Sequence, residues 1–92
     1  MRVNSLTGFS YDPALPEEFR LLCMLHNIGA ITLEKSLSIK EICEWTTIDA
    51  SIVTSFLQKL VELGYVQFIE TGGIKKYHVT TSGITKVLTL YS

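Results

Sequence analysis

The clearest pattern of apolar and polar positions lies between Asp49 and Val66, where apolar residues recur at spacings of three and four. This spacing predicts a helix with one buried face. Asp49 suits the N-cap because its carboxylate can accept hydrogen bonds from the first amides of the helix, and Gly64 stands where helices commonly end. The predicted buried face comprises Val53, Phe56, Leu57, Leu60 and Leu63, and the polar face comprises Ala50, Ser51, Thr54, Ser55, Gln58, Lys59 and Glu62.

A shorter helix is predicted just before it, over about residues 39–45. Ser38 and Glu41 have the spacing of a capping box, in which each side chain bonds to the backbone amide of the other residue. Only residues 46–48 separate the two helices, with Ile48 placed to fill the elbow between them. The two segments therefore predict a helix-turn-helix pair.

After this pair, residues 67–71 and 74–79 have strand propensity and flank Gly72-Gly73. Two extended runs joined by two glycines favour a β-hairpin. Ser82 is a plausible N-cap for a last helix, which we expect from about residue 83 to residue 90.

The first part of the chain divides into an arm and a helix. Residues 1–15 show no helical period, and we expect an N-terminal arm, lying along the domain or a second subunit, or else a partly ordered terminus. A helix is predicted from about Pro16 to Ile28, closed by Gly29. It is apolar nearly all round, so one face suits the core and a second face is expected to meet another helix or subunit.

Two motifs carry a family resemblance. The third helix ends in Leu-Gly-Tyr-Val and runs into a hairpin, which resembles the recognition helix of winged helix-turn-helix proteins. The segment from Tyr77 to Gly83 resembles the Tyr-x-Leu-Thr-x-x-Gly ending of MarR-like and small archaeal or archaeal-virus transcription regulators, with Val79 in place of Leu. The resemblance implies an α+β winged helix-turn-helix domain over residues 16–92: a three-helix core, a two- to three-stranded β wing that pairs with an extended link at 34–37, and a C-terminal helix.

This resemblance implies a transcription regulator that binds specific sequences of double-stranded DNA. The helix at 49–63 would enter the major groove, and the wing at 67–79 would approach the backbone or the minor groove. Related regulators often carry an Arg where this chain has Ser55. The alternative is a winged-helix module that binds another protein and no DNA. The residues placed on the DNA side are Ser51, Thr54, Ser55, Gln58, Lys59, Lys75, Lys76 and His78, the last because it is expected to point outward from its strand.

The same resemblance implies a homodimer formed by the terminal helices. Cys23 and Cys43 both occupy apolar positions, which fits three interpretations: reduced core cysteines, a Cys23 pair across the dimer, or a bond within one chain. No CxxC or paired-histidine spacing points to a metal site. The residues predicted at the dimer interface are Leu21, Cys23, Met24, Ile84, Val87, Leu88 and Tyr91.

Composition adds limits to this picture. The chain has 92 residues and a net charge of -1, yet residues 71–92 contain three lysines and no acid, so positive charge collects around the predicted wing. His26 and His78 have no nucleophile or carboxylate at a catalytic spacing, and we expect no enzymatic activity, no cofactor and no small-molecule ligand. No segment has the length and apolarity to cross a membrane, so we expect a soluble, cytoplasmic protein.

Overall fold

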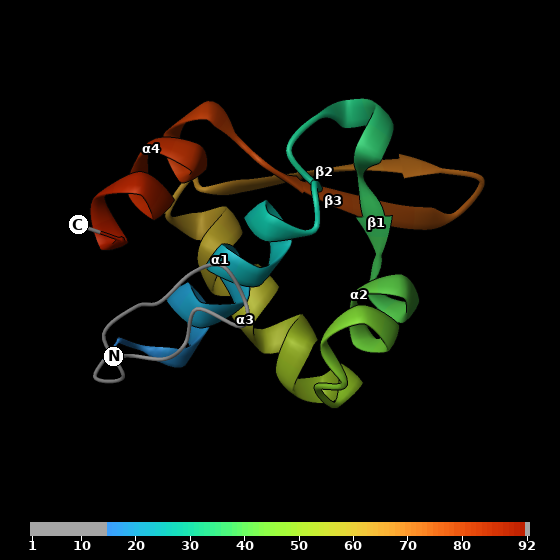
Figure 1. The fold of residues 1–92 in the computed structure, drawn as a ribbon. Helices are drawn as coiled ribbons and strands as arrows, with labels where there is room; N and C mark the ends of the chain where they lie inside the picture. Colours follow the sequence, from blue (N-terminus) through green and yellow to red (C-terminus); the bar gives the residue numbers. More distant parts are fainter. Residues whose placement is uncertain (1–14, 92) are drawn as a thin grey trace.

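The computed structural model describes residues 15–91, so the expected arm at 1–15 lies almost entirely outside the described residues (Figure 1). The elements in chain order are α1 (Glu17–Asn27), the 3-10 helix η2 (Leu33–Lys35), β1 (Leu37–Ser38), α2 (Ile39–Thr46), α3 (Ala50–Glu62), β2 (Val66–Thr71), β3 (Ile74–Val79) and α4 (Thr81–Leu90). In this view α1, α2 and α3 lie below a small antiparallel sheet, α4 lies at one end of the sheet, and the hairpin projects from the other end.

The predicted ends of the helix-turn-helix pair are confirmed. The Ser38 amide donates to Glu41 Oε1 at 2.9 Å and the Glu41 amide donates to Ser38 Oγ at 3.2 Å, which completes the capping box of α2. The Asp49 carboxylate accepts from the Ser51 amide at the start of α3. After α3 the chain turns through Gly64, whose φ of +82° is a left-handed conformation that glycine adopts at little cost.

The last helix begins earlier than predicted, because Thr80 and not Ser82 is its N-cap. The Thr80 hydroxyl accepts from the Gly83 amide at 3.0 Å and donates to the Gly64 carbonyl at 2.8 Å. Gly83 packs so closely on the end of α3 that an added Cβ would lie 2.2 Å from the Tyr65 carbonyl oxygen. These contacts fix the start of α4 against the turn that follows α3.

The sheet has the order β1-β3-β2, with both pairs antiparallel. The Gly72-Gly73 turn sets the register of the hairpin, so that Phe68 lies opposite Tyr77. The link at 34–37 is extended only at its end: Leu37 and Ser38 pair with β3, whereas Glu34 and Lys35 belong to η2. The prediction of an extended link is therefore wrong for that first half, because Thr32 caps a tight turn by accepting from the Lys35 amide.

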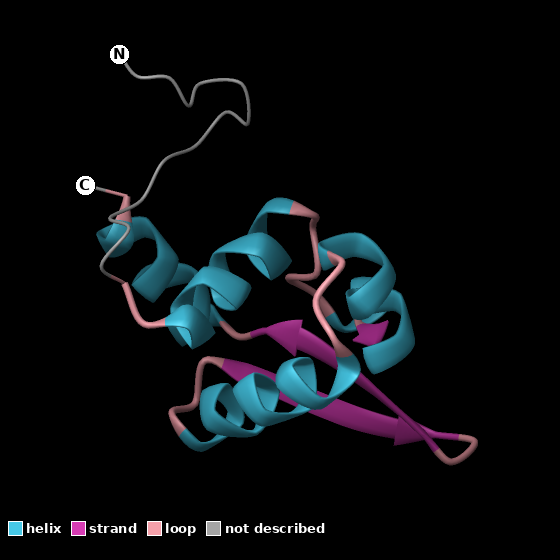
Figure 2. Cartoon of the chain, turned by 90° about the horizontal axis from the view of Figure 1, so that it is seen from below, coloured by secondary structure: helices cyan, strands magenta, loops and turns pink. Residues whose placement is uncertain are grey.

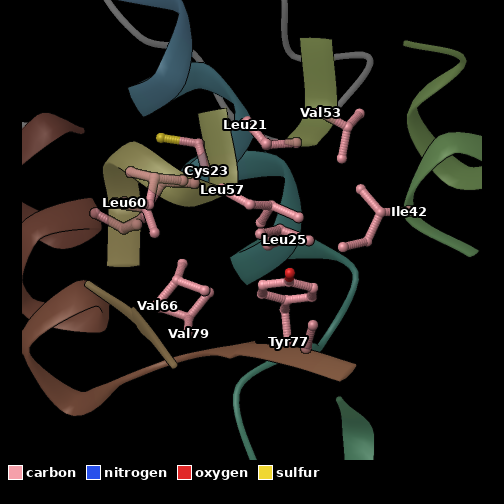
Figure 3. Close-up of a cluster of buried hydrophobic side chains, with 13 residues drawn as sticks. Leu21, Cys23, Leu25, Ile42, Val53, Leu57, Leu60, Val66, Tyr77 and Val79 are labelled. Atoms are coloured by element: carbon pink, nitrogen blue, oxygen red, sulfur yellow. The ribbon is translucent and has the colours of Figure 1, made fainter. Parts of the chain in front are cut away.

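The core lies between the sheet and the helices (Figure 3). Leu63, predicted on the buried face of α3, is 43% exposed because the helix has ended one residue earlier. Phe56 is only half-buried. The buried apolar residues are Leu21, Leu22, Cys23, Leu25, Ala30, Ile42, Val53, Leu57, Leu60, Val66, Tyr77, Val79 and Val87.

This core contains three residues that were predicted at a dimer interface. Leu21, Cys23 and Val87 are at most 1% exposed, so the assignment of these three to an interface is wrong: they pack inside one chain. Cys23 and Cys43 are free thiols, and burial raises the pKa of the Cys23 thiol. Among the described residues, this agrees with reduced cysteines and not with a bond within one chain. The accessible members of the predicted interface are Met24, Ile84, Leu88 and Tyr91.

Candidate nucleic-acid interface

The polar face of α3 is exposed along its whole length. The five α3 residues assigned to DNA, namely Ser51, Thr54, Ser55, Gln58 and Lys59, all have exposed side chains. Two of them also make local bonds: Ser51 Oγ donates to Asp49 Oδ2 at 2.6 Å, and Thr54 Oγ1 donates to the Ala50 carbonyl at 2.8 Å. The hydrogen bonds from Ser51 lower the pKa of Asp49, so the start of α3 carries a stable negative charge.

The polar residues of α3 fall on two flanks. Thr54, Gln58 and Glu62 follow one another at intervals of four and form a ridge beside the wing. Ile52 borders a pocket that it shares with Arg20 and Met24 of α1. Lys59 follows Ile52 by seven residues, about two helical turns, and therefore lies on the flank that faces α1. Figure 2 shows α3 lying alongside the hairpin, and a groove of about 480 Å³ separates them. The residues that line it are Thr54, Gln58, Val61, Glu62, Phe68, Lys75 and Tyr77.

The two wing lysines lie on opposite faces of the hairpin. Consecutive side chains of a strand alternate between faces, and Lys75 shares its face with Tyr77 and the groove. Lys76 lies instead opposite Ser38 of β1 and lines a shallow depression at the start of α2. There the pKa of Glu41 is lowered, mainly by its bond from the Ser38 backbone and in smaller part by the charge of Lys76. The structure thus brings Lys75, but not Lys76, to the polar flank of α3.

His78 does not point outward as predicted. The His78 side chain is only 9% exposed. The strand that carries it, β3, is also packed against η2. Its strand neighbours Tyr77 and Val79 are also buried, so both faces of β3 are covered at this end, whereas strand alternation predicts one outward face. His78 is therefore not available to contact a phosphate.

Charges of both signs lie on the elements that form the groove. Lys59 and Lys75 are exposed cations on α3 and β3, while Asp49, Glu62 and Glu70 are exposed carboxylates on or beside the same elements. Phe68 and Tyr77 also line the groove but were not predicted there, although the hairpin register alone pairs them. This surface can offer hydrogen-bond donors and acceptors with few charges, which suits few phosphate contacts.

Two other features, a metal site and a membrane-spanning helix, are both absent from the described residues. Among residues 15–91, no group of three or more His, Cys, Asp or Glu side chains is placed to hold a metal ion. Within the same range, none of the helices combines the length and hydropathy needed to span a bilayer.

A helix-turn-helix pair followed by a hairpin, with a short third strand, defines the winged-helix fold, and the predicted fold class is confirmed. The chain is similar to the DNA-binding fragment of TubR from Clostridium botulinum, with a TM-score of 0.69 and 27% identity over 97% of this chain and 98% of the fragment. No protein-family model matches the sequence, and no curated protein does.

Two further structures share the fold. A cysteine-to-serine mutant of MarR from E. coli, in complex with operator DNA, has a TM-score of 0.64 and 18% identity over 85% of this chain and 56% of MarR. F-93 of SSV1 has a TM-score of 0.60 and 15% identity over 89% of each chain. The chain thus spans nearly the full TubR fragment but little more than half of MarR.

Proposed function

We propose that this protein binds double-stranded DNA through α3 and the wing and acts as a transcription regulator. The observation that carries the proposal is the groove in which Thr54 and Gln58 of α3 face Lys75 of the wing. A helix in the major groove would let Gln58 read adenine, while Lys75 would contact a phosphate. The DNA-binding neighbours, TubR and MarR with its operator, support this assignment.

Ser51, Ser55 and Lys59 complete the proposed surface. The serine hydroxyls can bond phosphates or base edges of DNA. Lys59, on the flank of α3 that faces away from the wing, would contact the DNA backbone on the other side of the major groove. Lys76 belongs to the predicted DNA-binding set, but its side chain lies beside the start of α2 and not in the groove. Its contribution to DNA binding is therefore expected to be smaller than that of Lys75. We assign no catalytic step to this surface, and a regulator of this kind acts inside the cell.

We propose a homodimer as the binding species. Leu88 is 59% exposed on α4, and it stands near the half-buried residues Ile84 and Tyr91 of the same helix. A two-fold axis would present two recognition helices about 34 Å apart to a near-palindromic site. Sedimentation of the wild type and of Leu88→Lys tests this: the variant is expected to be monomeric, and a wild-type monomer at high concentration would contradict the dimer.

Fluorescence anisotropy with a random-sequence duplex tests DNA binding. We expect binding at low salt that weakens as salt rises, and a loss of about tenfold or more in affinity for the double variant Lys59→Ala/Lys75→Ala. Lys86→Ala is the control for the single variants Lys59→Ala and Lys75→Ala, because Lys86 lies on α4, away from the groove, and each of the three substitutions removes one positive charge. Equal losses for control and single variants, or no wild-type binding at low salt, would overturn the proposal.

A further inference from the structure

An aromatic residue holds the wing lysine that borders the groove. The ammonium of Lys75 lies 4.8 Å from the centroid of the Phe68 ring, within the range of a cation–π interaction. Both residues come from the hairpin and both line the groove beside Gln58. The position of the Lys75 charge is therefore tied to the position of one ring.

That ring is itself supported from the core. Phe68 packs in a tilted arrangement on Tyr77, with the ring centroids 5.5 Å apart. Tyr77 is only 7% exposed, and Figure 3 shows its ring pointing among the buried side chains toward Leu25. A continuous line of contacts thus runs from the core through two rings to the lysine.

The contact between Lys75 and Phe68 leaves the positive charge of the lysine available to bind an anion. Glu70 lies directly opposite Lys75 on β2, so a carboxylate is within the reach of the lysine. An ion pair with Glu70 would neutralise the ammonium, whereas the face of an aromatic ring orients the ammonium and leaves its charge available to an anion. Phe68 covers the lysine from one side, and the Lys75 side chain is otherwise exposed.

We propose that Phe68 is a positioning residue for DNA binding, which holds the ammonium of Lys75 at the mouth of the groove for a backbone phosphate. This inference rests on the proposed function. It predicts that loss of the ring and loss of the ammonium act on the same phosphate contact. The two substitutions should therefore be strongly non-additive.

The test compares Phe68→Leu, Lys75→Ala and the double variant in duplex titrations at several salt concentrations. Lys75→Ala is expected to lower affinity about five- to tenfold and to reduce the slope of log affinity against log salt by about 0.9, as for one lost phosphate contact. Phe68→Leu should give most of that loss, and adding it to Lys75→Ala should change affinity less than about twofold. Phe68→Tyr keeps a ring face and should restore binding.

A measurement without DNA checks the geometry separately. In the wild type, the Lys75 side-chain protons should show upfield ring-current shifts in the NMR spectrum, and Phe68→Leu should abolish them. Lys86 lies 5.2 Å from the Phe19 ring at the other end of the molecule, and its shifts should not change. Thermal melts confirm that each variant is folded at the titration temperature.

The outcomes separate the inference from the proposed function. Additive losses, or full binding by Phe68→Leu when Lys75→Ala is impaired, would overturn the positioning role and leave DNA binding in place. Failure of Phe68→Tyr to restore binding when its ring-current shifts are intact would also overturn it. If the wild type binds no duplex, both proposals fail, even where the ring-current shifts are present.

Discussion

The two faces of the wing treat adjacent lysines differently. On the groove face, the ammonium of Lys75 lies over the ring of Phe68, which orients its charge. On the opposite face, Lys76 lies at the start of α2, where its charge favours the ionised form of Glu41. The sequence places these residues side by side, yet the pleat of one strand separates them into two electrostatic settings.

The difference shows that counting charges along a sequence overestimates a binding surface. Two lysines in a wing suggest two phosphate contacts, but only one of them shares a face with the polar ridge of α3. The other lies near Glu41, a carboxylate that also caps a helix and whose pKa the lysine charge helps to lower. A charge contributes to a binding surface according to its face and its partner.

The largest expected effect comes from removing the residue that supports the groove face. Tyr77→Ala deletes a ring that is 7% exposed and is expected to destabilise the fold by about 3–5 kcal/mol through the lost apolar contacts and the cavity left behind. Urea denaturation measures this change. Tyr77→Phe is the control, since it keeps the ring and the packing against Phe68, and a similar loss for both variants would contradict a packing role.

The next effect separates the two lysines directly. Lys75→Ala is expected to weaken duplex binding about five- to tenfold, and Lys76→Ala less than about twofold, because only Lys75 faces the groove. Anisotropy titrations at one low salt concentration suffice for the comparison. Equal losses of affinity would show that both faces of the wing contact DNA, and would contradict the difference proposed between the two lysines.

A smaller effect tests the engagement of Lys76. Glu41→Gln keeps an oxygen that can accept from the Ser38 amide, so the capping box persists, but it removes the negative charge beside Lys76. In this background Lys76 is expected to contribute more to binding, and Lys76→Ala should reduce affinity more than it does in the wild type. An unchanged ratio between the two backgrounds would mean that Glu41 does not restrain Lys76.

The smallest effect is a pH dependence of stability. The pKa of Glu41 is lowered from its ordinary value of 4.5 by the Ser38 hydrogen bonds and the Lys76 charge. A lowered folded-state pKa means that this stabilisation is fully present above pH 4.5 and is lost as the pH falls through the folded-state value. Urea midpoints from about pH 6 down to about pH 3 should therefore fall slightly less in Glu41→Gln than in the wild type. A parallel fall in both proteins would exclude this contribution.

Local patterns predicted the fold well, since helix caps and turn residues act over a few positions. The capping box of Ser38 and Glu41, the Asp49 cap and the Gly72-Gly73 turn were all found from spacing alone. The turn even fixes the hairpin register, so the pairing of Phe68 with Tyr77 was available from the sequence.

Features decided by tertiary contacts were predicted poorly. Thr80 and Ser82 are both good caps, and the choice between them depends on the bond from Thr80 to the Gly64 carbonyl. A helix that is apolar nearly all round does not reveal which face meets its own core, so Leu21 and Cys23 were assigned to a partner. His78 was misplaced because strand alternation predicts the face of a side chain but does not reveal that both faces of β3 are covered at its end.

The contacts at the start of α4 have a mechanical consequence for the wing. The Val79 amide donates to the Ala30 carbonyl at 2.7 Å, and the Thr80 amide donates to the Tyr65 carbonyl at 2.9 Å, so the base of the hairpin is anchored to the ends of α1 and α3. β1 also pairs with β3 as far as Lys76, so only the end of the hairpin around Gly72-Gly73 extends beyond these contacts. Bending of the hairpin would displace that end most and the anchored part least. On DNA, such bending would let the end follow variations in groove width while Phe68 and Tyr77 keep their alignment.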